Sequence, residues 1–156
     1  MTAAQDGFHR RLFHIGPSGL SPDTAQSGGM RRIAAISSTT VGSRGLWMGQ
    51  THVAPATRSD NHHHGDSETG IYVVSGHPEF VFLDTSGGDA VEVRLRTSPG
   101  DYVYVPAWVP HREENPDPEN EAVVVIARDT QEAIVVNLAG LEWVGPGALG
   151  SADPPG

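Results

Sequence analysis

Residues 61–68 read Asn61-His62-His63-His64-Gly65-Asp66-Ser67-Glu68, which places three of the chain's eight histidines and two acidic residues in one short stretch. On an extended strand, side chains two positions apart point to one face and the residue between them points to the other. This alternation places His62 and His64 on one face as a ligand pair. His63 then either faces solvent or holds the two ligands in position without binding the metal. Two imidazoles and the Glu68 carboxylate are ligands typical of a transition-metal site.

A third imidazole, His111, lies 43 residues beyond Glu68. Short apolar or alternating runs bounded by Gly, Pro, Asn and Asp predict strands in this region and on both sides of it. We expect strands near residues 30–40, 46–54, 71–74, 80–83, 91–96, 102–105, 122–127 and 133–138. A further strand could cover residues 8–15, and residues 113–121 are predicted to form a solvated acidic loop. No segment predicts an amphipathic helix, so the pattern indicates an all-β barrel or sandwich.

Together with these predicted strands, residues 62–76 resemble the first motif of the cupin superfamily. That motif reads His-x-His, three or four residues, Glu, six residues, Gly. His62-His63-His64 supplies the histidines, Glu68 the acid and Gly76 the final glycine. Seven residues instead of six separate Glu68 from Gly76, so Thr69 occupies the strictly aligned position. The alternatives are a bulge at Thr69-Gly70 that restores Glu68 to the metal, or a Glu68 that lies outside the ligand shell and supports a histidine.

The second cupin motif is Gly, five residues, Pro-x-Gly-x-x-His, three residues, Asn. Gly100, Pro106, His111 and Asn115 follow this spacing, and Trp108 replaces the internal glycine. That replacement predicts a turn of different geometry, with an indole near the mouth of the pocket. The two motifs span residues 62–115, and the flanking strands extend the resemblance over roughly residues 30–140.

The resemblance implies a double-stranded β-helix, or jelly-roll, cupin barrel over residues 30–144. Residues 1–29 would form an N-terminal arm, partly in strand, and residues 145–156 a disordered tail. The barrel would hold one divalent metal ion, Fe, Zn, Mn, Ni or Cu, bound by His62, His64, His111 and Glu68. Cupin barrels commonly pair through an edge strand, so a homodimer is expected by analogy.

The amino-acid composition argues against several classes of binding partner and of chemical site. A formal charge of −9 argues against nucleic acid and against an anionic membrane surface. The absence of cysteine excludes disulfides, thiolate metal sites and cysteine nucleophiles. The N-terminus lacks the apolar stretch of a signal peptide and no run has membrane-spanning length, so we expect a soluble, cytoplasmic protein with a small-molecule substrate.

Other polar side chains are weaker candidates for the site. His52 and Gln50 share one face of a predicted strand, where they could serve as a general base and a substrate contact, although such residues are more often simply exposed. Tyr104 and Tyr102 share a face of the second-motif strand, where packing at a wet edge competes with a role in catalysis. Arg94 alternates with valines and is predicted on a solvated face.

Four functions remain open. The main hypothesis is a metal-dependent enzyme, either a dioxygenase or a Lewis-acid isomerase, lyase, cyclase or decarboxylase. Assistance to nitrogen–nitrogen bond formation is a further variant that rests on likeness of fold alone. The alternative is a non-catalytic, metal-dependent sensor or carrier of a small molecule. A storage protein with a relic site and a metal-free epimerase complete the set, and the retained ligand spacing counts against the epimerase.

Overall fold

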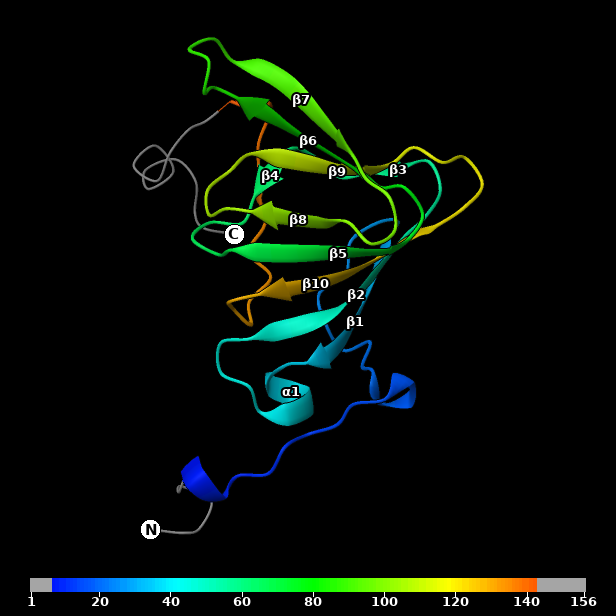
Figure 1. The fold of residues 1–156 in the computed structure, drawn as a ribbon, viewed down its shortest axis with the longest axis vertical. Coiled ribbons are helices and arrows are strands. Elements are labelled where there is room, and N and C mark those ends of the chain that lie inside the picture. Colours follow the sequence, from blue (N-terminus) through cyan, green and yellow to red (C-terminus); the bar gives the residue numbers. More distant parts are fainter. Residues whose placement is uncertain (1–6, 143–156) are drawn as a thin grey trace.

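The computed structural model describes residues 7–142, in which strands predominate and every strand pairing is antiparallel. The first sheet has the strand order β1-β2-β10-β5-β8, visible from bottom to middle in Figure 1. Its strands are β1 (Met30–Ile36), β2 (Trp47–Val53), β5 (Thr69–Ser75), β8 (Tyr102–Val105) and β10 (Ala122–Arg128). The all-β architecture expected from the sequence is therefore confirmed.

The second sheet has the order β11-β4-β9-β6-β7, and the short strand β3 also pairs with β9. Its strands are β3 (Thr57–Arg58), β4 (His62–His63), β6 (Glu79–Asp84), β7 (Val91–Arg96), β9 (His111–Asn115) and β11 (Val136–Asn137). The strand β9 overlaps the segment 113–121 that was predicted to be a solvated loop, so that prediction is wrong for residues 113–115. The strand owes its existence to pairing with β6, because its own sequence, His-Arg-Glu-Glu-Asn, has no apolar residue.

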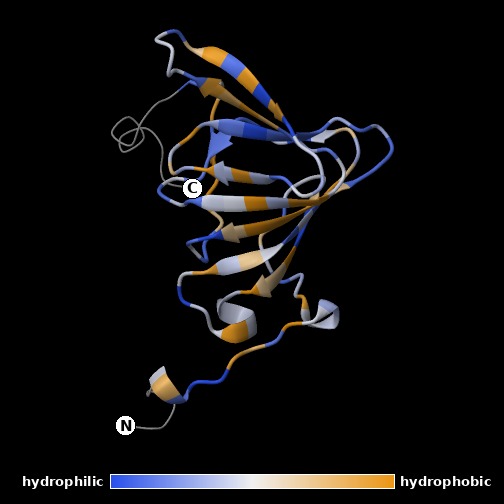
Figure 2. Ribbon diagram, viewed as in Figure 1, coloured by the Kyte–Doolittle hydropathy of each residue, from blue (hydrophilic) through white to orange (hydrophobic). Residues whose placement is uncertain are grey.

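Alternating residues of the first sheet form the inner face of the barrel. In β2 the odd positions from Trp47 to Val53 are buried and the even positions are partly exposed, and β5 alternates in the same way from Thr69 to Val73. Ile71 and Val73 of β5 pack with Val105 of β8 and Val124 of β10 against Phe80 of β6. In Figure 2 the first-sheet strands carry mixed or apolar colours, whereas β9 is blue.

Asn115 ties the end of β9 to the first sheet. The side chain is 1% exposed, and its amide donates hydrogen bonds to the carbonyls of Val53, Ala54 and Asn120, at 3.1, 3.2 and 2.9 Å. The second-motif asparagine is therefore a structural residue that satisfies buried carbonyls where two strands and a loop meet.

Charged side chains cover the face of β6, β7 and β9 that points away from the interior of the barrel. The Arg94 guanidinium donates to the carboxylates of Glu79 and Glu114, and Arg112 donates to Glu114 and Glu92. Arg94 is thus held within an ion-pair network, where the sequence suggested a freely solvated side chain.

Three strand predictions differ from the structure: those for residues 30–40, 8–15 and 133–138, the last of which is a strand only at Val136–Asn137. The strand expected to reach Thr40 ends at Ile36, and residues Ser38–Val41 form the short helix α1. Ser37 caps this helix because its hydroxyl accepts from the Thr40 N–H while the Thr40 hydroxyl accepts from the Ser37 N–H. Residues 8–15 do not form a strand and are flanked by single 3-10 turns at Gly7–His9 and Pro17–Gly19. The predicted tail, residues 145–156, lies outside the described residues.

Between residues 7 and 142, no helix has the length and apolar character needed to cross a membrane.

Candidate metal centre

Three histidine side chains converge at one place on the second sheet. His62 of β4 lies directly opposite His111 of β9 in the strand register, and their rings are 4.5 Å apart. The His64 ring lies 4.8 Å from His62 and 5.0 Å from His111. The period-two argument for His62 and His64, and the predicted approach of His111, therefore agree with the observed positions.

Each of the three imidazoles is oriented by a backbone carbonyl. The Nδ1 atoms of His62, His64 and His111 lie 2.7, 2.8 and 3.0 Å from the carbonyl oxygens of Asp60, Ile134 and Val109, respectively. A carbonyl can only accept, so each Nδ1 carries the proton, and the lone pair of a neutral imidazole resides on Nε2. This is the arrangement that typically orients metal-bound histidines.

A carboxylate joins the three imidazoles, and it comes from Glu113. Glu113 follows His111 by two positions on β9, so both side chains point to the same face. The Glu113 Oε1 atom lies 3.7 Å from His111 Nε2. Sequence analysis missed this residue because it placed Glu113 in an acidic loop, although the spacing rule that paired His62 with His64 also pairs His111 with Glu113.

The electrostatics of the cluster leave these ligands in metal-binding form. Burial, and then the neighbouring His111, lower the pKa of His62. Burial, His111 and His62 together lower the pKa of His64 to about 4, so both imidazoles are neutral at pH 7. Burial acts to raise the pKa of Glu113, but the contact with His111 and the nearby His62 and His64 outweigh it and lower this pKa to about 2.

The four residues fit a divalent metal ion. One ligand atom from each of His62, His64, His111 and Glu113 lies within 4.8 Å of the others. Bonds of about 2.0–2.2 Å to one ion place ligand atoms roughly 3–4 Å apart, a spacing that small side-chain rotations would reach. In addition, His111 Nε2 is buried and has no hydrogen-bond partner within the described part of the chain. A metal bond would satisfy this atom.

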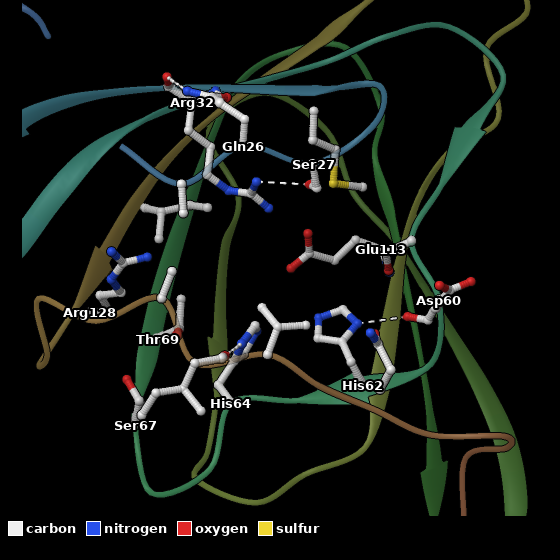
Figure 3. Close-up of a pocket in the computed structure, with 18 of the residues that line it drawn as sticks. Gln26, Ser27, Arg32, Asp60, His62, His64, Ser67, Thr69, Glu113 and Arg128 are labelled. Carbon is white, nitrogen blue, oxygen red and sulfur yellow. Dashed lines mark hydrogen bonds between the residues drawn. The ribbon is translucent and has the colours of Figure 1, made fainter. Parts of the chain in front are cut away.

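The cluster forms one wall of a cavity of about 460 Å³. His62, His64 and Glu113 line it from one side, and Arg32 and Arg128 line it from the first sheet (Figure 3). This volume is within the range of sites for small molecules. The arrangement thus combines a group that could hold a metal ion with space for a substrate beside it.

The structure does not bring Glu68 to this group. Glu68 is exposed, and its carboxylate accepts a hydrogen bond from the Tyr104 hydroxyl. Residues Thr69 and Gly70 pair in continuous register with β8 and β10, so the bulge that would have returned Glu68 to the metal group is absent there. Thr69, the strictly aligned residue, lines the cavity in its place.

The two catalytic candidates lie on the outer face of the first sheet. In β2, His52 alternates with the buried Thr51, and it contacts Glu121 and Gln50 at 3.1 and 3.3 Å. Tyr104 is 61% exposed and contacts Glu68. Neither His52 nor Tyr104 lines the cavity. The competing interpretation, side chains on a wet sheet surface, describes both positions.

For His63 the structure excludes the solvent-facing alternative, and the turn at Trp108 differs from expectation. His63 is 1% exposed, accepts a hydrogen bond from the Gly65 N–H and lies 5.6 Å from the Trp108 ring. Trp108 keeps a left-handed φ of 67°, so the turn retains the backbone conformation that glycine favours. The backbone N–H of Trp108 donates to the Gly65 carbonyl at 2.7 Å, and this hydrogen bond joins the two motif loops. The indole does not line the cavity.

Comparison with known proteins agrees with the fold described above. A sequence model of the family described as "Cupin domain" matches residues 49–127. No curated protein matches the chain.

Solved structures share the fold at low sequence identity. A structure of Bacillus subtilis oxalate decarboxylase, studied for its Mn(II) centres, is 22% identical, with a TM-score of 0.60 over 76% of this chain and 30% of that one. Peruvianin-I, a cysteine peptidase from Thevetia peruviana latex, is 15% identical, with a TM-score of 0.62 over 88% of this chain and 85% of that one. The chain thus spans less than a third of the oxalate decarboxylase. At these low identities the two structures show that the fold is shared and nothing about activity. The jelly-roll barrel expected from the sequence is therefore confirmed.

Proposed function

The chain belongs to the cupin domain family, and from that premise we propose that it is an enzyme that uses one divalent metal ion to transform a small molecule. The proposed ligands are His62, His64, His111 and Glu113. Glu113 replaces Glu68 in the ligand set because it shares the cavity wall with the histidines, whereas Glu68 is bound to Tyr104 on the outside.

One observation carries this proposal: three imidazoles are fixed by backbone carbonyls so that each presents Nε2, and they meet a carboxylate at the edge of a cavity. A site that served stability alone would have no reason to open onto a cavity of small-molecule size. Four protein ligands leave up to two further positions on an octahedral ion for water or substrate.

The bound ion would supply either Lewis-acid activation of a substrate oxygen, as in an isomerase, lyase or cyclase, or, if it is iron, a meeting point for O2 and substrate, as in a dioxygenase. The protein's own groups would orient the substrate against that position. Thr69 lines the cavity from β5 and Glu113 lies across from it, whereas the nearby Ser67 donates its hydroxyl hydrogen to Asp129. Fe, Zn, Mn, Ni and Cu all accept this mixed nitrogen and oxygen ligand set.

Metal analysis of protein purified without chelator or added metal tests the proposal. We expect close to one ion per chain in the wild type and none in the double variant His62→Ala, His111→Ala. Anaerobic loading with Fe(II) followed by O2-uptake measurements then separates dioxygenase chemistry from Lewis-acid chemistry. Tightly held metal without turnover of any substrate pool would favour the alternative, a non-catalytic metal-dependent binding protein. One ion per chain in the double variant would show that the ligand assignment is wrong.

A homodimer is part of this proposal. The edge strand β8 carries the exposed Tyr102 and Tyr104, and Tyr102 packs on Tyr72 of β5 at a ring distance of 4.9 Å. Pairing of two copies at this edge would cover the aromatic surface and the edge of β8 that pairs with no other strand among the described residues. Light scattering of the wild type and of a Tyr102→Glu variant would test it, with a monomeric wild type as the contrary result.

A further inference from the structure

Two arginines reach the cavity from the first sheet, opposite the metal group. Arg32 lies on β1 and Arg128 on β10, the two strands that flank β2. The register pairs Arg32 with Thr51 and Arg128 with Trp47, both buried residues of β2, so both arginines are on the inner face. Figure 3 shows the Arg32 side chain pointing into the cavity and Arg128 at its margin, and both residues line the cavity together with His62, His64 and Glu113.

Neither arginine has a carboxylate partner within residues 7–142. The Arg32 Nη1 atom donates to the Ser27 hydroxyl at 2.9 Å. The Arg128 Nε and Nη2 atoms donate to the carbonyls of Thr130 and Gln131, at 3.0 and 2.9 Å, and its guanidinium lies 4.1 Å from the centre of the Trp47 ring. These contacts fix the orientation of both guanidinium groups, and apart from the Trp47 ring they supply no negative charge to either arginine.

The surroundings show that this charge is costly. Burial lowers the pKa of Arg128 to about 10, and the charge of Arg32 adds to the shift. By contrast, Arg94 and Arg112 on the other face of the second sheet are paired with glutamates. Partly buried cations normally have such partners.

We propose that Arg32 and Arg128 bind an oxyanion group of the substrate, a carboxylate or a phosphate, while the other end of the substrate lies against the metal group. This inference rests on the proposed function and narrows its substrate class to small anions. A guanidinium presents a planar fork of N–H donors that matches either oxyanion. Among the described residues, no hydrogen-bond acceptor contacts Nε or Nη2 of Arg32 or Nη1 of Arg128, so these donors can bind the anion.

The position of the arginines also explains how a substrate would be oriented. The metal ligands come from β4, β9 and the residue after β4, all on or beside the second sheet, whereas both arginines come from the first sheet. A molecule with an anionic end and a reactive end would therefore bridge the two sheets in one direction. A neutral analogue would leave two cationic donors without partners, and such a loss typically reduces affinity strongly.

Calorimetric titration tests the inference with three probes: malonate, inorganic phosphate and the neutral malonamide. Each is titrated into metal-loaded and into chelator-treated protein, and the metal content of every sample is measured. We expect malonate or phosphate to bind the wild type and malonamide not to bind. Arg32→Gln and Arg128→Gln should each weaken oxyanion binding by about 10-fold or more while the metal content stays unchanged. The preferred probe identifies the oxyanion as a carboxylate or a phosphate.

Arg31→Gln is the matched control, because Arg31 precedes Arg32 on β1, is exposed and pairs with His52 on the outer face. It should bind the anions as the wild type does. If Arg128→Gln fails to fold, Arg128→Lys keeps the charge but removes the fork and should still weaken binding. Wild-type affinity in Arg32→Gln with its metal retained, or malonamide binding equal to malonate, would overturn the inference alone. A wild type without metal would overturn the proposed function, while titration of the chelator-treated protein would still test the arginines.

Discussion

Replacing Glu113 by glutamine tests the ligand set most directly. The pKa of Glu113 is lowered to about 2, so the side chain is ionised at neutral pH, and glutamine removes its full negative charge with little change in size. Four-ligand zinc sites contribute roughly 10–16 kcal/mol at pH 7, so one of four ligands accounts for ~3 kcal/mol. We therefore expect the metal dissociation constant of Glu113→Gln to rise about 100-fold.

Competition titration with a chromophoric chelator under Zn(II) or Mn(II) measures this constant. Glu68→Gln is the matched control, because it makes the same chemical change at the residue that the sequence motif indicated. Glu68 is exposed and contacts the Tyr104 hydroxyl, so its replacement should leave metal affinity within about 2-fold of the wild type. Thermal unfolding of both variants without metal shows whether the fold is retained.

Two results would refute this reasoning. Unchanged metal affinity in Glu113→Gln would mean that three imidazoles hold the ion and that the carboxylate serves another purpose, such as proton transfer. A loss in Glu68→Gln equal to that expected for Glu113→Gln would mean that the segment from Glu68 to Thr69 rearranges on metal binding and brings Glu68 to the ion.

Three further predictions concern residues around the site. Asn115→Ala should lower the free energy of unfolding by ~1–3 kcal/mol in chemical denaturation, because three carbonyls lose their buried donor. A decrease of less than about 0.5 kcal/mol would contradict the structural role of Asn115. Gly49→Ala should destabilise by about 1–3 kcal/mol, because an added Cβ would lie 2.3 Å from the Ile33 carbonyl oxygen; wild-type stability would show that β1 and β2 are spaced more widely. His52→Gln should leave metal affinity and oxyanion binding unchanged, since His52 faces outward, and a clear loss of either would return it to the list of catalytic candidates.

The strands that sequence analysis located best are those whose own residues determine them. Residues 91–96 alternate apolar and charged side chains between a glycine-rich turn and Pro99, and the strand β7 has those bounds. Residues 102–105 lie between Gly100 and Pro106, and β8 has those bounds as well. Turn residues and period-two alternation are local signals, and they suffice where the strand ends are set locally.

The strand β9 had no such signal. Its sequence is polar throughout, and it becomes a strand because Phe80 and Phe82 of β6 pair with Glu113 and His111. A contact between distant segments therefore converted an apparently solvated loop into the wall of the site. The helix α1 was missed for a related reason, because one capping box around Ser37 overrides the β-branched residues that predicted a strand.

The position of the carboxylate follows from the same rule that identified the histidines. The regular register of Thr69 and Gly70 with β8 and β10 keeps Thr69 on the inner face and turns Glu68 away, so the extra residue in the first motif removes its acid from the cluster. Period-two alternation on β9 then supplies Glu113 from the same face as His111. Moving the carboxylate from β5 to β9 has a consequence for the cavity. With the shorter Thr69 on the β5 side, the wall next to Arg128 carries no acid, and the cationic wall and the metal group face each other across space that a small anion can occupy.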